Sequence, residues 1–179
     1  ALPIFRMQVS TRGQVLLLIG QRYAEYGGTQ LQMYRSDINS QSPRPRLQEE
    51  ANQNQMVYSL IQEGLVAACH DISTGGAWIA LVEMLLGERG LPKVGFDINV
   101  PEDAPLEEIL FSENPGYIVA IDAKNEKVIR ERLQEASLTF FNIGISSNRE
   151  GIRIQQGTKE DTQIQISELN QQRERKNLK

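Results

Sequence analysis

The sequence has little of the chemistry that defines several classes of protein. Its 179 residues include one cysteine and one histidine, Cys69 and His70, so no intrachain disulfide can form. These two side chains alone also fall short of the usual ligand set of a zinc site. No run reaches the ~18 consecutive apolar residues that a membrane-spanning helix needs, and the N-terminus lacks a signal-peptide pattern. We therefore expect a cytoplasmic protein with no membrane partner and no metal site of its own.

Positive charge is scarce as well. The chain carries 19 Lys and Arg residues against 23 Asp and Glu residues, which gives a net charge of −4. Proteins that bind nucleic acid usually present a concentrated basic stripe, whereas basic residues gather here only near the C-terminus, between Arg173 and Lys179. We expect no nucleic-acid partner. Hydrophobic residues make up 40% of the chain, which is enough for one real core.

The pattern of polar and apolar segments predicts one folded domain over residues 13–166. Residues 1–12 are expected to be a linker or the remnant of a preceding domain, and residues 167–179 a polar C-terminal tail. Short apolar runs bounded by glycine or proline predict strands over 14–19, 65–69, 94–100, 117–121, 140–145, 151–155 and 163–166. Helical patterns cover 47–63, 77–86, 106–111 and 124–136. Such an order predicts an α+β fold, an α/β sandwich in which a mixed or antiparallel sheet is covered by helices.

The most informative segment runs from Cys69 to Met84 and reads CHDISTGGAWIALVEM. A predicted strand ends there in polar residues, and a Gly-Gly pair then opens an apolar helix. The start of a helix offers free backbone N–H groups and the positive end of the helix dipole, which together favour an anion. The candidates for binding a substrate or its phosphate are therefore His70, Asp71, Ser73, Thr74, Gly75 and Gly76.

A purely structural interpretation of the same segment stays open. Ser73 or Thr74 could simply cap the helix, and the glycines could serve a tight turn. His70 could hydrogen-bond the loop rather than take part in chemistry. We expect Asp71, the one fixed negative charge of the loop, to point towards backbone N–H groups and away from a bound anion. Cys69 is expected to be a small buried residue.

Four blocks of the sequence resemble, in order, motifs of the phosphoribosylformylglycinamidine synthases. Gln14 to Gly20 resembles an opening strand of the type Gly-Asp-x-Ile-x-Leu-Leu-Gly, and Gly27 to Gln30 resembles Gly-Gly-Ser-Glu. His70 to Gly76 resembles His-Asp-x-Ser-Asp-Gly-Gly, which precedes an apolar helix that ends in Ala-Glu-Met. Leu110 to Gly116 resembles Leu-Phe-[Gly/Ser]-Glu-x-x-[Gly/Ser]-Arg. The resemblance covers about residues 13–166 and is to the C-terminal, AIR-synthetase-related domain of that family.

The resemblance implies a part of an ATP-dependent carbon–nitrogen ligase. The whole enzyme converts formylglycinamide ribonucleotide, ATP and glutamine-derived ammonia into formylglycinamidine ribonucleotide, ADP and phosphate. ATP and Mg²⁺ would be bound mainly by other domains, so the implied partners are those domains, a glutaminase subunit or domain, and the ribonucleotide substrate. This chain would form a wall of the substrate site and be inactive alone. No catalytic residue is assigned, and the secondary candidates for ligand contact are Gly27, Gly28, Thr29 and Glu113.

Departures from the family pattern leave two alternatives open. Thr74 stands where the family usually has Asp, Gln30 where it has Glu, and Tyr117 where Arg is common, so three charges are missing. Thr29 replaces Ser and keeps a hydroxyl. The chain could be a non-catalytic binding or assembly module with the same fold. It could also belong to another branch of the AIR synthetase superfamily, such as thiamine monophosphate kinase.

Overall fold

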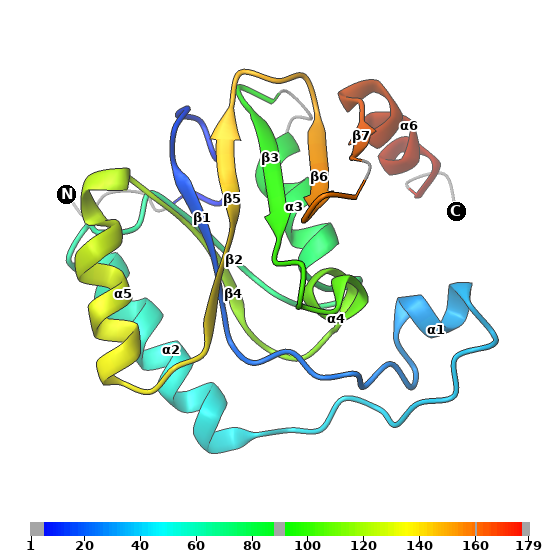
Figure 1. Cartoon of the computed structure of the whole chain (residues 1–179), viewed down its shortest axis with the longest axis horizontal. Helices are drawn as coiled ribbons and strands as arrows, with labels where there is room; N and C mark the ends of the chain where they lie inside the picture. The colour runs from blue at the N-terminus through cyan, green and yellow to red at the C-terminus, as the bar shows by residue number, and fades with distance from the viewer. Residues whose placement is uncertain (1–5, 88–91, 160, 177–179) are drawn as a thin grey trace.

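A seven-stranded mixed sheet forms the centre of the computed structural model, which describes residues 6–87, 92–159 and 161–176 (Figure 1). The strands of the described residues are β1 (Val15–Ile19), β2 (Ala68–Asp71), β3 (Gly95–Val100), β4 (Tyr117–Ile121), β5 (Phe140–Ser147), β6 (Ile152–Gln156) and β7 (Thr162–Ile164). Their order in the sheet is β2-β4-β1-β5-β3-β6-β7. Only the β3–β6 pair is parallel. The predicted α+β fold with a mixed sheet is therefore confirmed.

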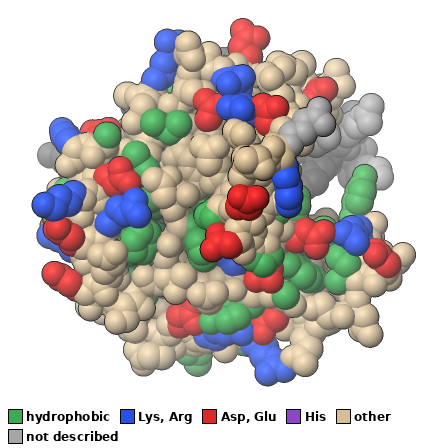
Figure 2. All heavy atoms as spheres, in the orientation of Figure 1, with side chains coloured by type: hydrophobic (Ala, Val, Ile, Leu, Met, Phe, Trp, Pro, Cys, Tyr) green, Lys and Arg blue, Asp and Glu red, His purple; other side chains and the backbone are tan. Residues whose placement is uncertain are grey.

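Helices lie on both faces of this sheet. In the described residues they are α1 (Gln30–Tyr34), α2 (Leu47–Gln62), α3 (Gly76–Leu86), α4 (Leu106–Phe111), α5 (Glu126–Glu135), α6 (Ile166–Lys176) and a 3-10 turn, η1 (Ala123–Asn125). Figure 1 shows α2 and α5 together over one side and α3 behind the sheet. Figure 2 shows acidic and basic side chains interspersed over the face that is turned towards the viewer in Figure 1.

The central strand β1 is buried on both sides, which explains its unbroken apolar sequence VLLLI. Successive side chains of a strand point to opposite faces. Leu16 and Leu18 accordingly pack in a core shared with α3, α4 and α6, whereas Val15, Leu17 and Ile19 pack in a second core with α2 and α5. Two hydrophobic cores, one on each face, thus fix the helices against the sheet.

The strand directions bring several loops to one end of the sheet. β4 is antiparallel to both β1 and β2, so the chain leaves β1 and β2 at the same end at which it enters β4. β5 is antiparallel to both β1 and β3, so β3 ends there too. The residues after Ile19, after Asp71 and before Tyr117 therefore meet at this end. We call it the motif end, because three of the four motif blocks lie in these segments.

The two ends of the described chain pack on the domain. Arg6 forms a parallel β-bridge with Ala68, Val9 is buried, and the Val9 N–H donates to the carbonyl of Met84 at 3.0 Å. The segment expected to be a polar tail forms α6 up to Lys176, and its Leu169 is only 3% exposed. Residues 1–5 and 177–179 lie outside the described residues, so the linker and tail interpretations stay predictions there. No helix within the described ranges combines the length and the apolar character needed to cross a bilayer.

Candidate ligand-binding site

The carboxylate of Glu113 joins two of the motif blocks at the motif end. Its Oε1 atom accepts the backbone N–H of Gln30 at 2.9 Å, at the first residue of α1. The same atom accepts the backbone N–H of Gly75 at 2.8 Å, just before α3. These partners lie 83 and 38 residues away in the sequence. One side chain therefore fixes both Gly-Gly segments against the residues that follow α4.

The segment from Ser112 to Gly116, here the 112–116 segment, is also held from the β1 side. The Arg22 guanidinium donates to the carbonyls of Asn114 at 2.7 Å and Pro115 at 2.6 Å. Arg22 is only 2% exposed, and burial lowers its pKa to about 10, so it remains charged at neutral pH. On the other side, the N–H of Ile72 donates to the carbonyl of Gly116 at 2.8 Å. The 112–116 segment is thus hydrogen-bonded both to the chain that follows β1 and to the chain that follows β2, and we call it the junction.

The predicted start of a buried helix at the Gly-Gly pair is correct, but no side chain caps it. Gly75 occupies the N-cap position with φ of 86°, and the Gly76 N–H donates to the carbonyl of Ser73 at 3.0 Å. Ser73 and Thr74 are exposed, and neither hydroxyl has a hydrogen-bond partner among the described residues. Both hydroxyls are therefore available to a ligand at the motif end.

His70 and Asp71 are the last two residues of β2. The His70 Nε2 atom is 2.9 Å from a carboxylate oxygen of Glu83 on α3, and its Nδ1 atom is 2.6 Å from the carbonyl oxygen of Asp71. Both ring nitrogens therefore face oxygen atoms of the protein itself. The Asp71 carboxylate is 68% exposed and 3.6 Å from His70 Nδ1. The sequence suggests Asp71 as an acceptor of backbone N–H groups in this loop. In the structure the Gly75 N–H donates to Glu113.

The secondary candidates around Gly27 mainly hold their own turn together. The Thr29 side chain is buried, its hydroxyl donates to the carbonyl of Tyr26 at 2.7 Å, and it accepts the N–H of Gln32 as the N-cap of α1. The Gly27 N–H donates to the carbonyl of Gln41. The exposed Gly28 donates its N–H to Gln32 Oε1 at 2.7 Å. These residues position α1, and the Thr29 hydroxyl already has its partners.

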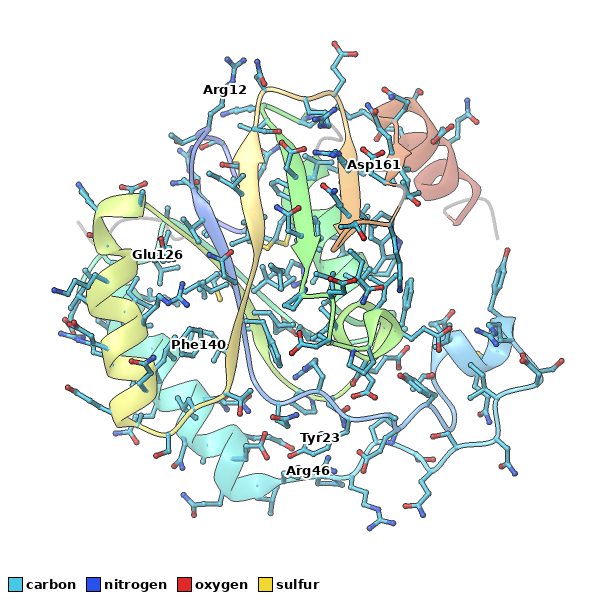
Figure 3. The ribbon with its side chains drawn as sticks, viewed as in Figure 1. Arg12, Tyr23, Arg46, Glu126, Phe140 and Asp161 are labelled. Atoms are coloured by element: carbon cyan, nitrogen blue, oxygen red, sulfur yellow. The ribbon has the colours of Figure 1, made fainter. Side chains whose placement is uncertain are left out.

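A second carboxylate, Glu25, ties the segment after β1 to the start of α2 and to the 112–116 segment. The Arg46 guanidinium donates to both of its oxygens, at 3.0 and 2.7 Å, and the Asn114 side chain donates at 3.0 Å. Arg46 also stacks 3.5 Å from the centre of the Tyr23 ring, as Figure 3 shows at the motif end. The hydrogen bonds from Arg46 lower the pKa of Glu25 to about 2.

Replacing Glu25 by Gln is expected to lower the free energy of unfolding at pH 7 by about 2 kcal/mol, because charge-assisted hydrogen bonds are lost. The folded-state pKa of about 2 lies below the ordinary value of 4.5. The contribution of the carboxylate is therefore fully present above pH 4.5 and is lost as the pH falls towards 2. Urea unfolding of both proteins over this range measures it.

The matched control is Glu63→Gln, which breaks an exposed ion pair with Arg132. Solvent screens such a pair, so its replacement should change stability much less. A constant difference between the Glu25 variant and the unmodified protein from pH 7 down to pH 2.5 would contradict the electrostatic origin of the effect.

A cavity of about 400 Å³ adjoins the junction on the β3 side. It lies between the residues that follow β1, Gln21 and Arg22, and the β3–α4 connection, and Phe141 also lines it. Small-molecule sites commonly measure about 300–1,000 Å³, so the volume suits a small ligand. Asp103 and Glu108 bring two carboxylates to its wall.

The described residues include no group of three or more His, Cys, Asp or Glu side chains that could hold a metal ion. Cys69 is partly buried, and this burial raises the pKa of its thiol to about 12, so the thiolate is not populated at neutral pH. Within the part of the chain that the structure describes, these findings indicate neither a metal cluster nor an ionised thiol. The chemistry that the geometry offers is hydrogen bonding by Ser73 and Thr74 beside a fixed carboxylate, Glu113.

Sequence reasoning missed the residues that assemble the site, namely Arg22, Glu25, Glu83 and Asn114. Arg22 and Glu25 lie in the polar stretch after β1, where nothing in the pattern separates a buried ionic residue from a solvated one. Glu83 had a weak signal, because a lone acidic residue interrupts the apolar helix of α3. Asn114 and Glu113 stand in a motif block, which marks them as candidate site residues but does not indicate which residues they hydrogen-bond.

The fold and the junction define a class: an α+β domain with helices on both faces of a mixed sheet and with three of the motif blocks gathered at one end of it. A family model described as "AIR synthase related protein, C-terminal domain" matches residues 11–157, which is most of the chain. The chain therefore belongs to the family of AIR synthase related proteins, as their C-terminal domain.

Solved structures agree with this fold. The chain superimposes on Thermotoga maritima PurL complexed with FGAR with a TM-score of 0.76 and 16% identity, over 92% of this chain and 29% of that one. For T. maritima PurL complexed with ATP the values are 0.70, 17%, 92% and 27%. Thiamine-monophosphate kinase from Stenotrophomonas maltophilia matches with a TM-score of 0.53 and 12% identity, over 84% and 52%. At these identities the likeness shows the fold, and this chain spans less than a third of the PurL chains.

Proposed function

We propose that the chain is the C-terminal domain of a phosphoribosylformylglycinamidine synthase, working in purine biosynthesis in the cytoplasm. Its share of the reaction is to form one wall of the ribonucleotide site, with Ser73 and Thr74 facing the phosphate of formylglycinamide ribonucleotide. Its partners are the remaining domains of the synthetase subunit and a glutaminase subunit or domain that supplies ammonia. We propose no nucleic-acid partner and no contact with a membrane.

The observation that carries this proposal is the convergence at the motif end. Three segments that resemble the synthase motifs are far apart in the sequence, yet Glu113 bonds directly to the other two through Gln30 and Gly75. The hydroxyls of Ser73 and Thr74 lie exposed beside these bonds and have no partner among the described residues, so they are available to a ligand. Ligand sites in sheet-based domains often gather at strand ends, where loops are positioned by a rigid scaffold.

ATP and Mg²⁺ are assigned in this proposal to the other domains. The described residues offer no metal-ligand group, and the sequence has no Walker-type phosphate loop. We therefore derive no step of phosphoryl transfer from this chain. Its own residues bind and orient: Arg22 and Glu113 shape the junction, and the Ser73 and Thr74 hydroxyls donate to the ligand.

We expect the chain alone to produce no ADP above background when given ATP, formylglycinamide ribonucleotide and ammonia, because it lacks a nucleotide-phosphate loop. Adding the separately produced remaining domains of the ligase should restore ADP formation that depends on both the ribonucleotide and ammonia. A coupled assay of ADP release measures both conditions.

The same assay distinguishes the alternatives. ADP formation that requires thiamine monophosphate instead of the ribonucleotide would move the chain to the kinase branch of the superfamily. Assembly with the other domains without any turnover, although those domains turn over with their usual C-terminal domain, would support a non-catalytic assembly module. Substantial turnover by the chain alone would overturn the proposed division of labour.

A further inference from the structure

Glu113 makes two bonds through one oxygen atom, and the two donors belong to different loops. Gln30 N–H lies at the start of α1 and Gly75 N–H precedes α3, at 2.9 and 2.8 Å. The 112–116 segment that carries Glu113 is itself fixed by the buried Arg22 and by the Ile72 N–H. The carboxylate is therefore carried by a segment that is itself hydrogen-bonded on two sides.

The arrangement matters because no other hydrogen bond links these two loops within the described residues. α1 is five residues long, none of them buried, and it extends away from the sheet in Figure 1. Gly75 sits in a left-handed conformation with no side-chain cap, and the one bond inside the loop before α3 that the described residues show runs from the Gly76 N–H to the Ser73 carbonyl. Removing the shared acceptor would leave the Gln30 and Gly75 N–H groups without this partner and would break the link between the two segments.

We infer that Glu113 is a positioning residue that holds the two Gly-Gly segments in a fixed relation, and so presents Ser73 and Thr74 to the ligand. The identity of the ligand rests on the proposed function, whereas the coupling of the two loops through Glu113 does not depend on it. Because Glu113 already uses the Gly75 N–H, that N–H group is not available to an anion while this bond is made, whereas the two hydroxyls are.

A pH titration of the full chain, labelled with ¹⁵N, tests the coupling without any ligand. The amide shifts of Gln30 and Gly75 should move with one common midpoint, since both report the titration of the same carboxylate. Arg22 and Glu25 bond to the 112–116 segment, and Asp71 lies in the adjoining loop. The pocket beside Asn114 and Pro115 is also lined by Arg44, Arg46, Glu49 and Glu50, so each of these groups could add its own transition. The Gly28 amide, bonded to the neutral Gln32, is the control and should not share the midpoint.

Glu113→Gln should abolish this shared transition while keeping an acceptor oxygen, and therefore the fold. Two different midpoints for Gln30 and Gly75 in the unmodified chain, or a shared transition that persists in Glu113→Gln, would overturn the inference. Glu113→Ala should instead speed amide hydrogen exchange at both positions, and equal exchange rates before and after the change would also count against it.

In the complete enzyme, Glu113→Ala should raise the KM for the ribonucleotide roughly tenfold with a smaller change in kcat, because binding geometry is lost. Glu113→Gln should restore most of the KM. A shared amide midpoint combined with an unchanged KM would leave the coupling intact and refute the proposed substrate site. Separate midpoints would refute the positioning role whatever the kinetics show.

Discussion

Replacing Gly76 by Ala is expected to lower the free energy of unfolding by about 2–5 kcal/mol, a large effect for one methyl group. Gly76 has a φ of +70°, where a side chain costs about 1–2 kcal/mol. A Cβ atom there would also lie 2.7 Å from the carbonyl oxygen of Leu110 and 2.8 Å from the backbone of Phe111. Backbone atoms have no rotamer to escape into, and overpacking adds about 1–3 kcal/mol.

The matched control is Gly64→Ala, at the end of α2. Gly64 has a φ of +68°, nearly the same as Gly76, but nothing lies within 4 Å of its added Cβ. This variant should lose only the backbone term, about 1–2 kcal/mol. Urea unfolding of both variants separates the two contributions. Equal losses at the two positions would mean that the close approach of α3 to the end of α4 is not what requires glycine.

The Gly76 contact explains why the second residue of the Gly-Gly pair is a glycine. The sequence predicts that a Gly-Gly pair opens a buried helix, since a polar loop gives way there to a long apolar run. The structure adds the partner: Gly76 packs on the backbone of Leu110 and Phe111, which belong to another motif block. Which chain segment approaches a glycine depends on strand order, and periodicity carries no information about strand order.

The short helix α1 has a capping signal in the sequence, at Thr29 and Gln32. Thr29 and Gln32 have the Thr-x-x-Gln spacing of a capping box, and the structure shows Thr29 as the N-cap and Gln32 bonded to the Gly28 N–H. This segment has almost no apolar periodicity, so the capping residues are the feature of the sequence that indicates a helix here. For α6 the sequence offers Leu169 among polar residues, and the structure shows that this leucine is buried.

The role of Glu113 lies beyond what a single sequence can give. The motif resemblance singles out Glu113 as a candidate for ligand contact, but its bonds reach residues 38 and 83 positions away. Hydrogen bonds over such distances are decided by the packing of β4 between β1 and β2, which brings the three loops to one end. Local patterns predict the elements well because burial repeats along each element, whereas contacts between loops leave no such repeat.

Replacing Ser73 by Ala in the complete enzyme is expected to weaken binding of the ribonucleotide substrate about 10- to 100-fold. The Ser73 side chain is exposed at the motif end and has no partner among the described residues, so its hydroxyl is free to donate to a phosphate oxygen. A hydrogen bond to a charged group contributes about 1.5–3 kcal/mol, which corresponds to this range of dissociation constants. Calorimetric titration with the ribonucleotide measures the change, and ATP affinity should stay nearly the same.

The control for this prediction is Ser10→Ala. Ser10 is also exposed, but it precedes β1 and so lies at the opposite end of the sheet, near Arg12 at the top of Figure 3. Ser10→Ala should leave substrate binding unchanged. Thr74 replaces the Asp that is usual in the resembled motif, and a carboxylate there would repel a phosphate unless a cation lay between them. Thr74→Asp should therefore weaken binding further than Thr74→Ala does. If Ser73→Ala and Thr74→Asp both bind the ribonucleotide as tightly as the unmodified enzyme and only melt at lower temperature, the loop serves to start α3 and does not contact the phosphate.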